Sequence, residues 1–488
     1  MAKAGFDEVR NFIGGRLVPS TGTSKRDIIS PLDGKVISSV GLSCRRDLDN
    51  AVDAAKKAFA GWSSVTIKER AQVFFRYKRL LEENIKDLAE TIHIEHGKTM
   101  DESEAEVEKG IEITEFACSL PQIAAGEGLE VSKGIYCHYD RVPLGVVSSI
   151  VPFNFPVMVP HWTIPIAIML GNSFILKPSE QVPLSSVKIA ALLKEAGLPD
   201  GVFNTVNGDR EIVEAICDHP EIKAVSFVGS TNVAKAVYSR ATSRFKRALC
   251  LGGAKNHCFL LPDANTDMSA RNITASFAGC AGQRCMALSV LLAVGPVDDK
   301  IERICEEAAK LIPGKNLGPV ISRAARDRII GYIDGAEKAG AKVLLDGRKA
   351  KIEGDPNGFY LGPTVIDYVT PGMKAAQDEI FGPVLSIIRV KNIREGIEIE
   401  NAHPCGNAAS VFTQNGALAE EIIKNVSSGM NGINIGVPVP REPFAFGGWN
   451  DSRFGAGDIT GKSSINFWTQ DKKVTAKWNP EAGHDWMS

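Results

Sequence analysis

Hydrophobic residues in the first quarter of the chain recur three or four positions apart, which is the spacing of amphipathic helices. Residues 47–62 form the first such stretch. Thr66 and Glu69 have the spacing of a capping box and are expected to open a second helix that ends near Gly97. A third, acidic helix is expected over 101–125. These helices carry no catalytic motif.

The pattern changes near residue 145, where short runs of β-branched residues begin to alternate with helical stretches. Strands are expected at 145–151, 173–177, 202–206 and 224–228, and helices at 183–196, 210–218 and 232–241. A second set has strands at 258–261, 288–294 and 382–390 and helices at 301–311 and 324–339. This alternation predicts an α/β protein with two doubly wound, parallel-sheet domains and a binding cleft between them.

Two further hydrophobic stretches need a separate interpretation. Residues 152–171 are long and apolar enough to resemble a membrane span, but four prolines make a continuous helix implausible. We expect a strand end and loop followed by a short buried helix over 160–170. Residues 465–478 alternate like a strand that must pair with a partner subunit or with a distant hairpin.

Composition narrows the class of protein. The 488 residues suggest about three domains, or two large ones, at about 150 residues each. The 56 Lys and Arg nearly balance the 58 Asp and Glu, which disfavours a nucleic-acid partner. The ten cysteines form no C-x-x-C pair, so neither a zinc site nor a disulfide framework is expected. With no export signal evident in residues 1–10, we expect a cytoplasmic protein that uses neither metal nor membrane.

Common nucleotide-binding fingerprints are absent from the sequence. Neither G-x-G-x-x-G nor a complete P-loop occurs. The segment 227–230 joins a strand to a helix, and the amides of Gly229 and Ser230 could receive a phosphate, although an ordinary turn is the better explanation of this segment taken alone. Lys177 and Glu180 follow another strand, where they could hold ribose hydroxyls or form a solvated turn.

The segment 279–285 carries the clearest candidate chemistry. Its glycines and alanines permit close approach of a ligand, and Arg284 places a cation beside the Cys285 thiol. A neighbouring cation favours the nucleophilic thiolate. An inert buried cysteine is the alternative.

Six motifs occur in the order and spacing of the NAD(P)-dependent aldehyde dehydrogenase superfamily, which the chain resembles over nearly its whole length. They are PFNFP at 152–156, KPSE at 177–180, FVGS at 227–230, LGG at 251–253, GQRC at 282–285 and EIFGPV at 379–384. GAKNH at 253–257 and GQRCMALS at 282–289 look like the coenzyme A-acylating methylmalonate-semialdehyde dehydrogenase group.

The resemblance implies the aldehyde dehydrogenase fold, with a division of the chain and a set of site residues. The NAD-binding domain would comprise 1–125 and 142–255, the catalytic domain 256–461, and a small β oligomerisation element 126–141 and 462–488 of a homodimer or homotetramer. Cys285 would be the nucleophile, and Asn154 with the Cys285 N–H would stabilise the oxyanion. NAD, favoured over NADP by Glu180, would be bound by Pro152, Phe153, Lys177, Glu180, Gly229, Ser230, Leu251, Gly252, Glu379 and Phe381.

One departure from the family concerns the release of the acyl group. Hydrolytic members have Glu directly before Leu-Gly-Gly, whereas this chain has Cys250, and a second glutamate frequent near the C-terminus is replaced by Gln470. Loss of a general base disfavours attack by water, and coenzyme A, a thiol, needs less assistance. We expect an acyl-CoA product; a hydrolytic aldehyde dehydrogenase and a non-catalytic NAD-binding protein are the alternatives.

The small-molecule substrate is expected to be a small anionic aldehyde, malonate or methylmalonate semialdehyde. By the resemblance, Arg284 pairs with the substrate carboxylate. A second arginine of the group is Lys109 here, which keeps the charge without the bidentate geometry.

Overall fold

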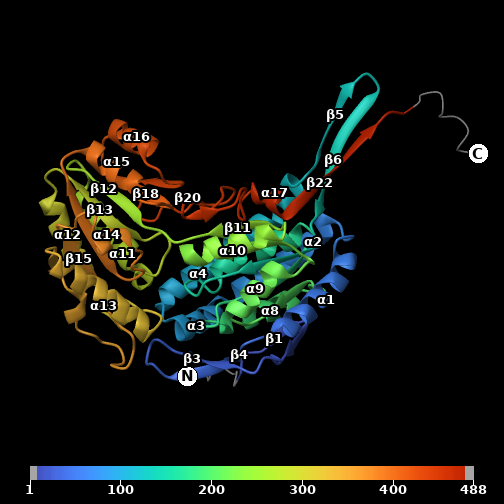
Figure 1. Ribbon diagram of the computed structural model, residues 1–488, viewed down its shortest axis with the longest axis horizontal. Helices are drawn as coiled ribbons and strands as arrows, with labels where there is room; N and C mark the ends of the chain where they lie inside the picture. Colours follow the sequence, from blue (N-terminus) through green and yellow to red (C-terminus); the bar gives the residue numbers. More distant parts are fainter. Residues whose placement is uncertain (1–7, 479–488) are drawn as a thin grey trace, which may run out of the picture.

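The computed structural model describes residues 8–478 and consists of two α/β lobes with a β arm that projects from one of them (Figure 1). Residues 1–7 and 479–488, which belong to the predicted NAD-binding domain and oligomerisation element, lie outside the described residues. In the figure the first lobe is coloured from blue to green and the second from olive to orange.

The first lobe is built on a sheet with strand order β2-β1-β9-β8-β7-β10-β11-β21. The strands are β1 (Asn11–Ile13), β2 (Arg16–Val18), β7 (Val146–Ile150), β8 (Ser173–Lys177), β9 (Phe203–Thr205), β10 (Ile222–Val228), β11 (Arg247–Leu251) and β21 (Arg453–Phe454). The five central strands are parallel, and their order along the chain reverses between β7 and β10. The predicted doubly wound sheet is confirmed, with its switch point at the carboxyl ends of β7 and β10.

Helices cover this sheet and an additional hairpin extends from it. The helices are α1 (Arg45–Trp62), α2 (Ile67–Glu83), α3 (Ile85–His96), α4 (Met100–Cys118), α5 (Leu120–Ile123), α6 (Met158–His161), α7 (Ile164–Met169), α8 (Leu184–Glu195), α9 (Arg210–Asp218) and α10 (Thr231–Ser243), and the hairpin is β3 (Lys25–Ile29) with β4 (Val36–Gly41).

The capping box is confirmed, since the Thr66 hydroxyl accepts a hydrogen bond from the Glu69 N–H at 3.3 Å. The single helix expected to run to Gly97 is wrong, because Asn84 leaves helical geometry and separates α2 from α3.

The second lobe has a sheet of order β14-β15-β16-β13-β12-β18-β19, parallel except at β14. Its strands are β12 (Asn256–Leu260), β13 (Leu288–Val294), β14 (Lys342–Leu345), β15 (Thr364–Asp367), β16 (Val384–Val390), β18 (Ala408–Phe412) and β19 (Met430–Ile433). Its helices are α11 (Thr266–Ala278), α12 (Asp298–Ala308), α13 (Arg323–Lys338), α14 (Lys374–Gln377), α15 (Ile393–Ala402) and α16 (Gly416–Asn425), and a two-strand ladder joins β17 (Cys405–Gly406) to β20 (Trp449–Asn450). This sheet is also doubly wound, with its reversal between β12 and β18.

The arm is a three-stranded antiparallel sheet in the order β22-β6-β5. β5 (Glu127–Ser132) and β6 (Ile135–Pro143) form a hairpin, and β22 (Thr469–Ala476) pairs with β6 along its whole length. Of the two partners expected for the C-terminal strand, the distant hairpin of the same chain is therefore present.

Two parts of the predicted division differ from the observed sheets. Within 256–461, strand β21 pairs with β11 and extends the first sheet. The start of the expected C-terminal strand is instead a short helix, α17 (Ser464–Trp468), because Phe467 and Trp468 are buried in the first lobe's core. Only the residues after Trp468 belong to the arm.

The apolar stretch 152–171 folds as expected into a loop and the short helices α6 and α7, buried within the first lobe. Over residues 8–478, no helix combines the length and the apolarity required for a membrane span.

Candidate active site

Eight of the ten residues expected to bind the cofactor lie at the carboxyl ends of four neighbouring strands of the first lobe, and Glu379 and Phe381 lie before β16 of the second. Pro152 and Phe153 follow β7, Lys177 ends β8, Gly229 follows β10, and Leu251 ends β11 with Gly252 directly after it. This is the edge at which open parallel sheets bind ligands. The topology thus brings together motifs that are up to 100 residues apart in the sequence.

Lys177 and Glu180 form a partly buried ion pair at this edge. The Lys177 ammonium donates to the Glu180 carboxylate over 3.0 Å, and Arg26, from strand β3, donates to the other oxygen at 3.1 Å. Burial alone would raise the pKa of Glu180, but the charge of Lys177 and hydrogen bonds hold it below its ordinary value. Glu180 is therefore an anion at neutral pH. Arg26 was missed because it is 154 residues away in sequence.

The turn after β10 requires glycine at position 229. A Cβ there would lie 2.5 Å from the Phe227 ring, and the Gly229 N–H donates to the Leu251 carbonyl at 3.1 Å. Ser230 occupies the N-cap position of α10, but its side chain makes no capping hydrogen bond. The backbone of this turn and the N-terminus of α10 lie at the same carboxyl edge of the sheet as the Lys177–Glu180 pair.

The loop that carries Cys285 is held tightly against the loop that follows Glu379. Cys280 and Ala281 have positive φ angles of 51° and 53°, which are uncommon for residues other than glycine. Gly282 has φ of 71°, and a Cβ on it would be 2.0 Å from the Gly382 carbonyl oxygen. Only glycine permits this approach, which explains the Gly-Gln-Arg-Cys pattern in physical terms.

The backbone of Cys285 is fixed by two amide side chains. Asn256 and Asn407 each donate from Nδ2 to the Cys285 carbonyl at 2.9 Å. The Asn154 amide lies beside the same loop and donates to the Gln283 carbonyl at 3.0 Å. Sequence reasoning identified Asn154 but missed Asn256 and Asn407. The only available signal was the position of Asn256 within the GAKNH motif.

Burial strongly affects the acidity of the nucleophile candidate. Burial raises the pKa of the Cys285 thiol to about 12, and the negative charge of Glu379 adds to this effect. Burial likewise raises the pKa of Glu379 to about 7, opposed by a hydrogen bond from the Ala254 N–H at 3.0 Å. The charge of Lys255 also opposes the rise in the pKa of Glu379.

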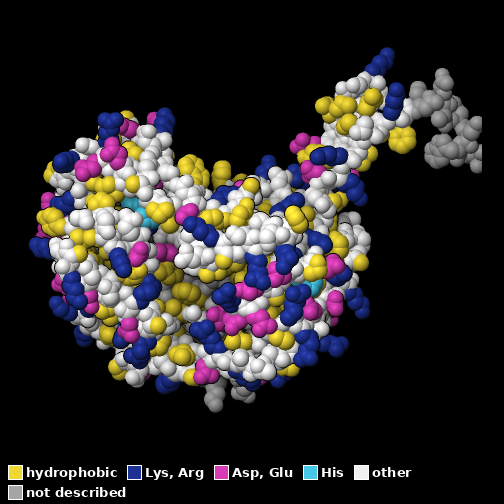
Figure 2. Space-filling view, viewed as in Figure 1, with side chains coloured by type: hydrophobic (Ala, Val, Ile, Leu, Met, Phe, Trp, Pro, Cys, Tyr) yellow, Lys and Arg dark blue, Asp and Glu magenta, His cyan; other side chains and the backbone are white. Residues whose placement is uncertain are grey.

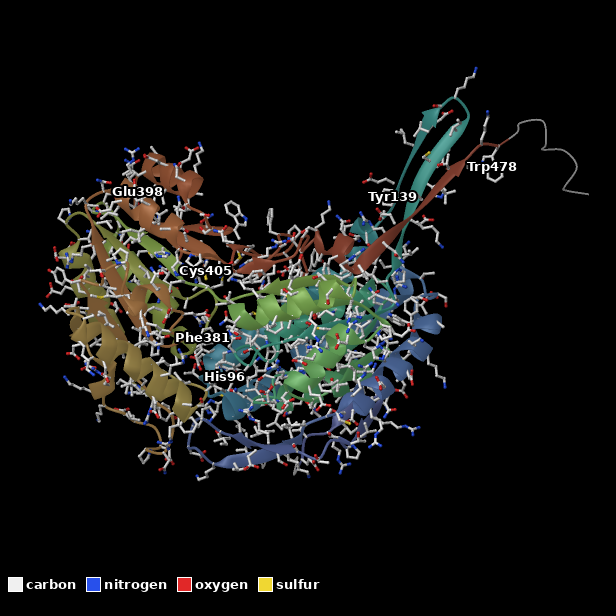
Figure 3. All side chains as sticks on the ribbon, in the orientation of Figure 1. His96, Tyr139, Phe381, Glu398, Cys405 and Trp478 are labelled. Carbon is white, nitrogen blue, oxygen red and sulfur yellow. The ribbon has the colours of Figure 1, made fainter. Side chains whose placement is uncertain are left out.

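A row of rings crosses the junction between the lobes next to this site. Phe153 lies edge-to-face with Phe381 at 5.9 Å between ring centres and stacks with His96 at 6.0 Å. Figure 3 shows His96 and Phe381 close together at this junction, and Figure 2 shows a hollow between the lobes with hydrophobic side chains in it. Burial lowers the pKa of His96, so its ring is neutral.

A small pocket opens beside Cys285. It is lined by Ala254, Asn256, Gly282, Arg284, Cys285, Ala287, Leu288, Ser289, Glu379, Ile380, Phe381, Gly382 and Val384. Glu379 is its only carboxylate. Cys250 is fully buried in an apolar cluster of the first lobe, and Gln470 is exposed on the arm, paired with Val142. The exposed position of Gln470 on the arm therefore says nothing about a general base in the site. Cys250 is a thiol where hydrolytic family members have a glutamate, so that position has no carboxylic acid.

The two cations expected to bind the substrate carboxylate already have partners in the protein. Arg284 donates to the Cys280 sulfur at 3.2 Å and lies 3.8 Å from a carboxylate oxygen of Glu102. Lys109 contacts the carboxylates of Glu112 at 2.7 Å and Glu442 at 3.0 Å. Arg284 lines the pocket with Cys285, and Lys109 does not.

A buried ion pair that sequence reasoning missed supports the Asn154 loop. Lys98 pairs with Glu106, with both side chains fully buried, and its ammonium donates to the Asn154 carbonyl at 2.6 Å. Glu106 in turn accepts from the N–H groups of Val157 and Met158 at 2.8 and 3.1 Å. The loop is thereby fixed at one end to Glu106 of α4 and at the other to Lys98, two residues before that helix.

Comparison with known proteins identifies the family. The aldehyde dehydrogenase family profile matches residues 17–474. The chain is 43% identical over 479 residues to malonate-semialdehyde dehydrogenase 2 of Bacillus thuringiensis (strain Al Hakam), covering 96% of this chain and 98% of that protein. It is 42% identical over 483 residues to malonate-semialdehyde dehydrogenase 1 of Geobacillus thermodenitrificans (strain NG80-2), covering 97% and 99%.

Solved structures agree with this assignment. A putative methylmalonate-semialdehyde dehydrogenase from Sinorhizobium meliloti 1021, solved in complex with NAD, has a TM-score of 0.95 and 40% identity, covering 97% of this chain and 98% of that one. A methylmalonate-semialdehyde dehydrogenase from Oceanimonas doudoroffii has a TM-score of 0.95 and 42% identity with the same coverage. This chain therefore belongs to the aldehyde dehydrogenase family.

Proposed function

We propose that the protein is an NAD-dependent dehydrogenase that oxidises a small anionic semialdehyde and transfers the acyl group to coenzyme A. The observation that supports acyl transfer to coenzyme A is the scarcity of carboxylates near Cys285. Glu379 is the only carboxylate lining the Cys285 pocket, and Cys250 occupies the position of the usual general base. A thiol acceptor fits this site better than water.

The residues at the strand ends of the first lobe fit NAD. The partly buried Lys177–Glu180 pair offers a donor and an acceptor to ribose hydroxyls. The turn at Gly229 leads into the N-terminus of α10, whose first amides have no partner within the helix and could meet phosphate. The Glu180 anion would repel a 2′-phosphate, which favours NAD over NADP. Ser230 would contact the pyrophosphate, Glu379 the nicotinamide ribose, and Pro152, Phe153, Leu251, Gly252 and Phe381 would line the remaining surface.

The first half of the reaction takes place on Cys285. Its thiol releases a proton to solvent, and the sulfur bonds to the aldehyde carbon to give a thiohemiacetal oxyanion. The Asn154 amide and the Cys285 N–H stabilise that charge. NAD held at the strand ends of the first lobe would supply the acceptor for the hydride that the carbon loses as the carbonyl re-forms. An acyl-thioester remains on Cys285.

The second half transfers the acyl group. The sulfur of coenzyme A attacks the thioester carbon and loses its proton, and the Cys285 sulfur leaves and is protonated. Overall, aldehyde, NAD and coenzyme A give acyl-CoA, NADH and one proton. Coenzyme A provides its own thiolate fraction, so the step proceeds without the general base that water would need.

The substrate class follows from the relatives and from the pocket. The relatives are named malonate-semialdehyde and methylmalonate-semialdehyde dehydrogenases. Arg284 provides a cation at the pocket beside the nucleophile, suited to the substrate's carboxylate.

The arm and the cysteines support two further parts of the proposal. Leu129, Val131 and Tyr136 are exposed on the arm, where hydrophobic side chains gather in Figure 2, and Figure 3 places Tyr139 on the same sheet. An apolar sheet with two open edges favours assembly of copies as a homodimer or homotetramer. All ten cysteines are free, which fits a reducing cytoplasm.

We assign residues 256–461 to the catalytic domain and the lobe before them to the NAD-binding domain.

The proposal is tested by assaying the purified protein with malonate semialdehyde and NAD, with and without coenzyme A, and identifying the product. We expect acyl-CoA in equal amount to NADH and a rate at least about 100-fold lower without coenzyme A. NADH formation unchanged by coenzyme A, with free acid as product, would instead establish the hydrolytic alternative.

A further inference from the structure

Helix α4 presents one polar face to the nucleophile and Asn154 loops. Glu102, Glu106 and Lys109 are spaced four and three residues apart, which places them on one side of the helix. Glu102 accepts from the Cys280 N–H, and Glu106 accepts from the N–H groups of the Asn154 loop. Lys109 is one turn further along this face, about 4.5 Å beyond Glu106.

The helix is in close contact with the rest of the site at this level. A Cβ on Gly110, next to Lys109, would lie 3.4 Å from the His161 ring, which belongs to the segment that carries Asn154. Helix α4 thus packs at the level of Lys109 against the segment that carries Asn154, although Lys109 does not line the small pocket beside Cys285.

Glu442 reaches Lys109 from the opposite side of the same region. It belongs to the segment before Phe446, whose ring lies 4.4 Å from that of Trp162, and Val437 and Val439 of this segment pack against the core cluster that Cys285 also contacts. The side chains of Lys109 and Glu442 are 19% and 13% exposed, whereas that of Glu112 is 48% exposed. Glu442 is thus the sheltered partner of Lys109, and Glu112 the solvated one.

We propose that Glu442 determines specificity by competing with the substrate carboxylate for Lys109. An anionic aldehyde that uses Lys109 must displace a sheltered carboxylate and leave it close to its own negative charge. This electrostatic cost of binding applies to anionic aldehydes and is absent for neutral aldehydes of the same size. This inference rests on the proposed function, because it takes the aldehyde to be the substrate.

The test compares Glu442→Gln with the wild type on malonate semialdehyde and propanal, which differ by a carboxylate in place of a methyl group. The variant keeps the size and a hydrogen-bonding oxygen but removes the sheltered negative charge, so that Lys109 keeps only the solvated Glu112 as an ionic partner. We expect KM for malonate semialdehyde to fall about tenfold, and KM for propanal to change less than about twofold.

Two further variants give the controls. Glu108→Gln removes the same charge from an exposed position of α4 and should leave the ratio of the two KM values unaltered. Lys109→Gln should raise KM for malonate semialdehyde and remove the effect of Glu442→Gln in the double variant. An unchanged ratio in Glu442→Gln, or the same fall in Glu108→Gln, would overturn the proposal.

Failure of the proposed function gives a different result. If the wild type oxidises propanal but not malonate semialdehyde, the proposed substrate is wrong. Inhibition of propanal oxidation by malonate then tests the role of Glu442 directly. We expect malonate to inhibit Glu442→Gln about tenfold more strongly than the wild type. Equal inhibition of the two proteins would contradict competition between Glu442 and the carboxylate.

Discussion

In the first lobe the candidate cofactor groups follow the carboxyl ends of parallel strands, whereas in the second lobe the reactive groups precede the amino ends. Lys177 ends β8, and Gly229 follows β10. Cys285 lies before β13, Glu379 before β16, and Asn407 before β18. Both sheets are doubly wound, yet the candidate groups of the first lobe lie at the carboxyl edge of its sheet and those of the second lobe lie at the amino edge. A shared architecture therefore does not imply a shared role.

The two edges also hold their functional groups differently. At the carboxyl edge, the N-terminal amides of helix α10 are available without special side chains. At the amino edge, the side chains of Asn256 and Asn407 must fix the Cys285 carbonyl, and a glycine at 282 is needed for close packing. The catalytic edge consequently depends more on individual side chains, and substitutions there should have larger effects on turnover.

The strongest test of this contrast is replacement of the nucleophile. Cys285→Ser should lower kcat by at least about 10³-fold, because a hydroxyl at the same place is a far weaker nucleophile. NAD binding, measured by fluorescence titration, should persist, because most of the candidate cofactor groups are on the other lobe and Glu379 and Phe381 are unchanged. Cys44→Ser, at the N-cap of α1, is the matched control and should retain full activity. Substantial turnover in Cys285→Ser would show that the nucleophile is elsewhere.

Removal of the oxyanion donor comes next. Asn154→Ala should lower kcat by about 10²- to 10³-fold with little change in KM, because the amide acts mainly on charge that develops during attack. Stopped-flow measurement of the first NADH turnover isolates this step. A change confined to KM would indicate that Asn154 only binds substrate.

A substitution at the carboxyl edge should act on binding instead. Glu180→Gln should raise KM for NAD about tenfold with kcat nearly unchanged, since it removes a charged acceptor for ribose hydroxyls. It should also narrow the preference for NAD over NADP. Initial rates with both cofactors measure this, and a fall in kcat without a change in KM would contradict the separation of roles between the lobes.

The smallest effect concerns stability and pH at Glu379. Burial raises its pKa from an ordinary value of 4.5 to about 7, so the folded state binds more protons than the unfolded state between these values. Stability from this group is therefore lost as pH rises from about 4.5 to 7. Glu379→Gln should be more stable than the wild type at pH 8 by about 2 °C in Tm, and this gain should shrink toward pH 4.5. A gain independent of pH would exclude titration of Glu379 as its cause.

The sequence predicted the fold where local signals were sufficient. The strand at 173–177 and the Thr66–Glu69 capping box agree with the structure because hydrophobic runs and caps act over a few residues. The helix expected to continue to Gly97 breaks at Asn84, and residues 465–468 are helical, because burial of Phe467 and Trp468 overrides the alternating pattern.

The candidate site could be predicted only in part for a similar reason. Motif recognition identified Cys285, Asn154 and Glu379, which the fold brings to the junction of the lobes. It could not identify the contact of Asn407 with Cys285 or of Glu442 with Lys109, because the partners are 122 and 333 residues apart and each is an ordinary polar residue in its local sequence. Pairing over such distances is decided by the packed structure.

Release of the acyl group is the central claim, and single-turnover kinetics test it most directly. The protein is mixed with malonate semialdehyde and excess NAD without coenzyme A, and NADH is followed by stopped flow. The account predicts a burst of about one NADH per Cys285, a following rate at least about 100-fold slower, and full turnover once coenzyme A is added. Linear NADH formation without a burst, at a rate that coenzyme A leaves unchanged, would contradict it.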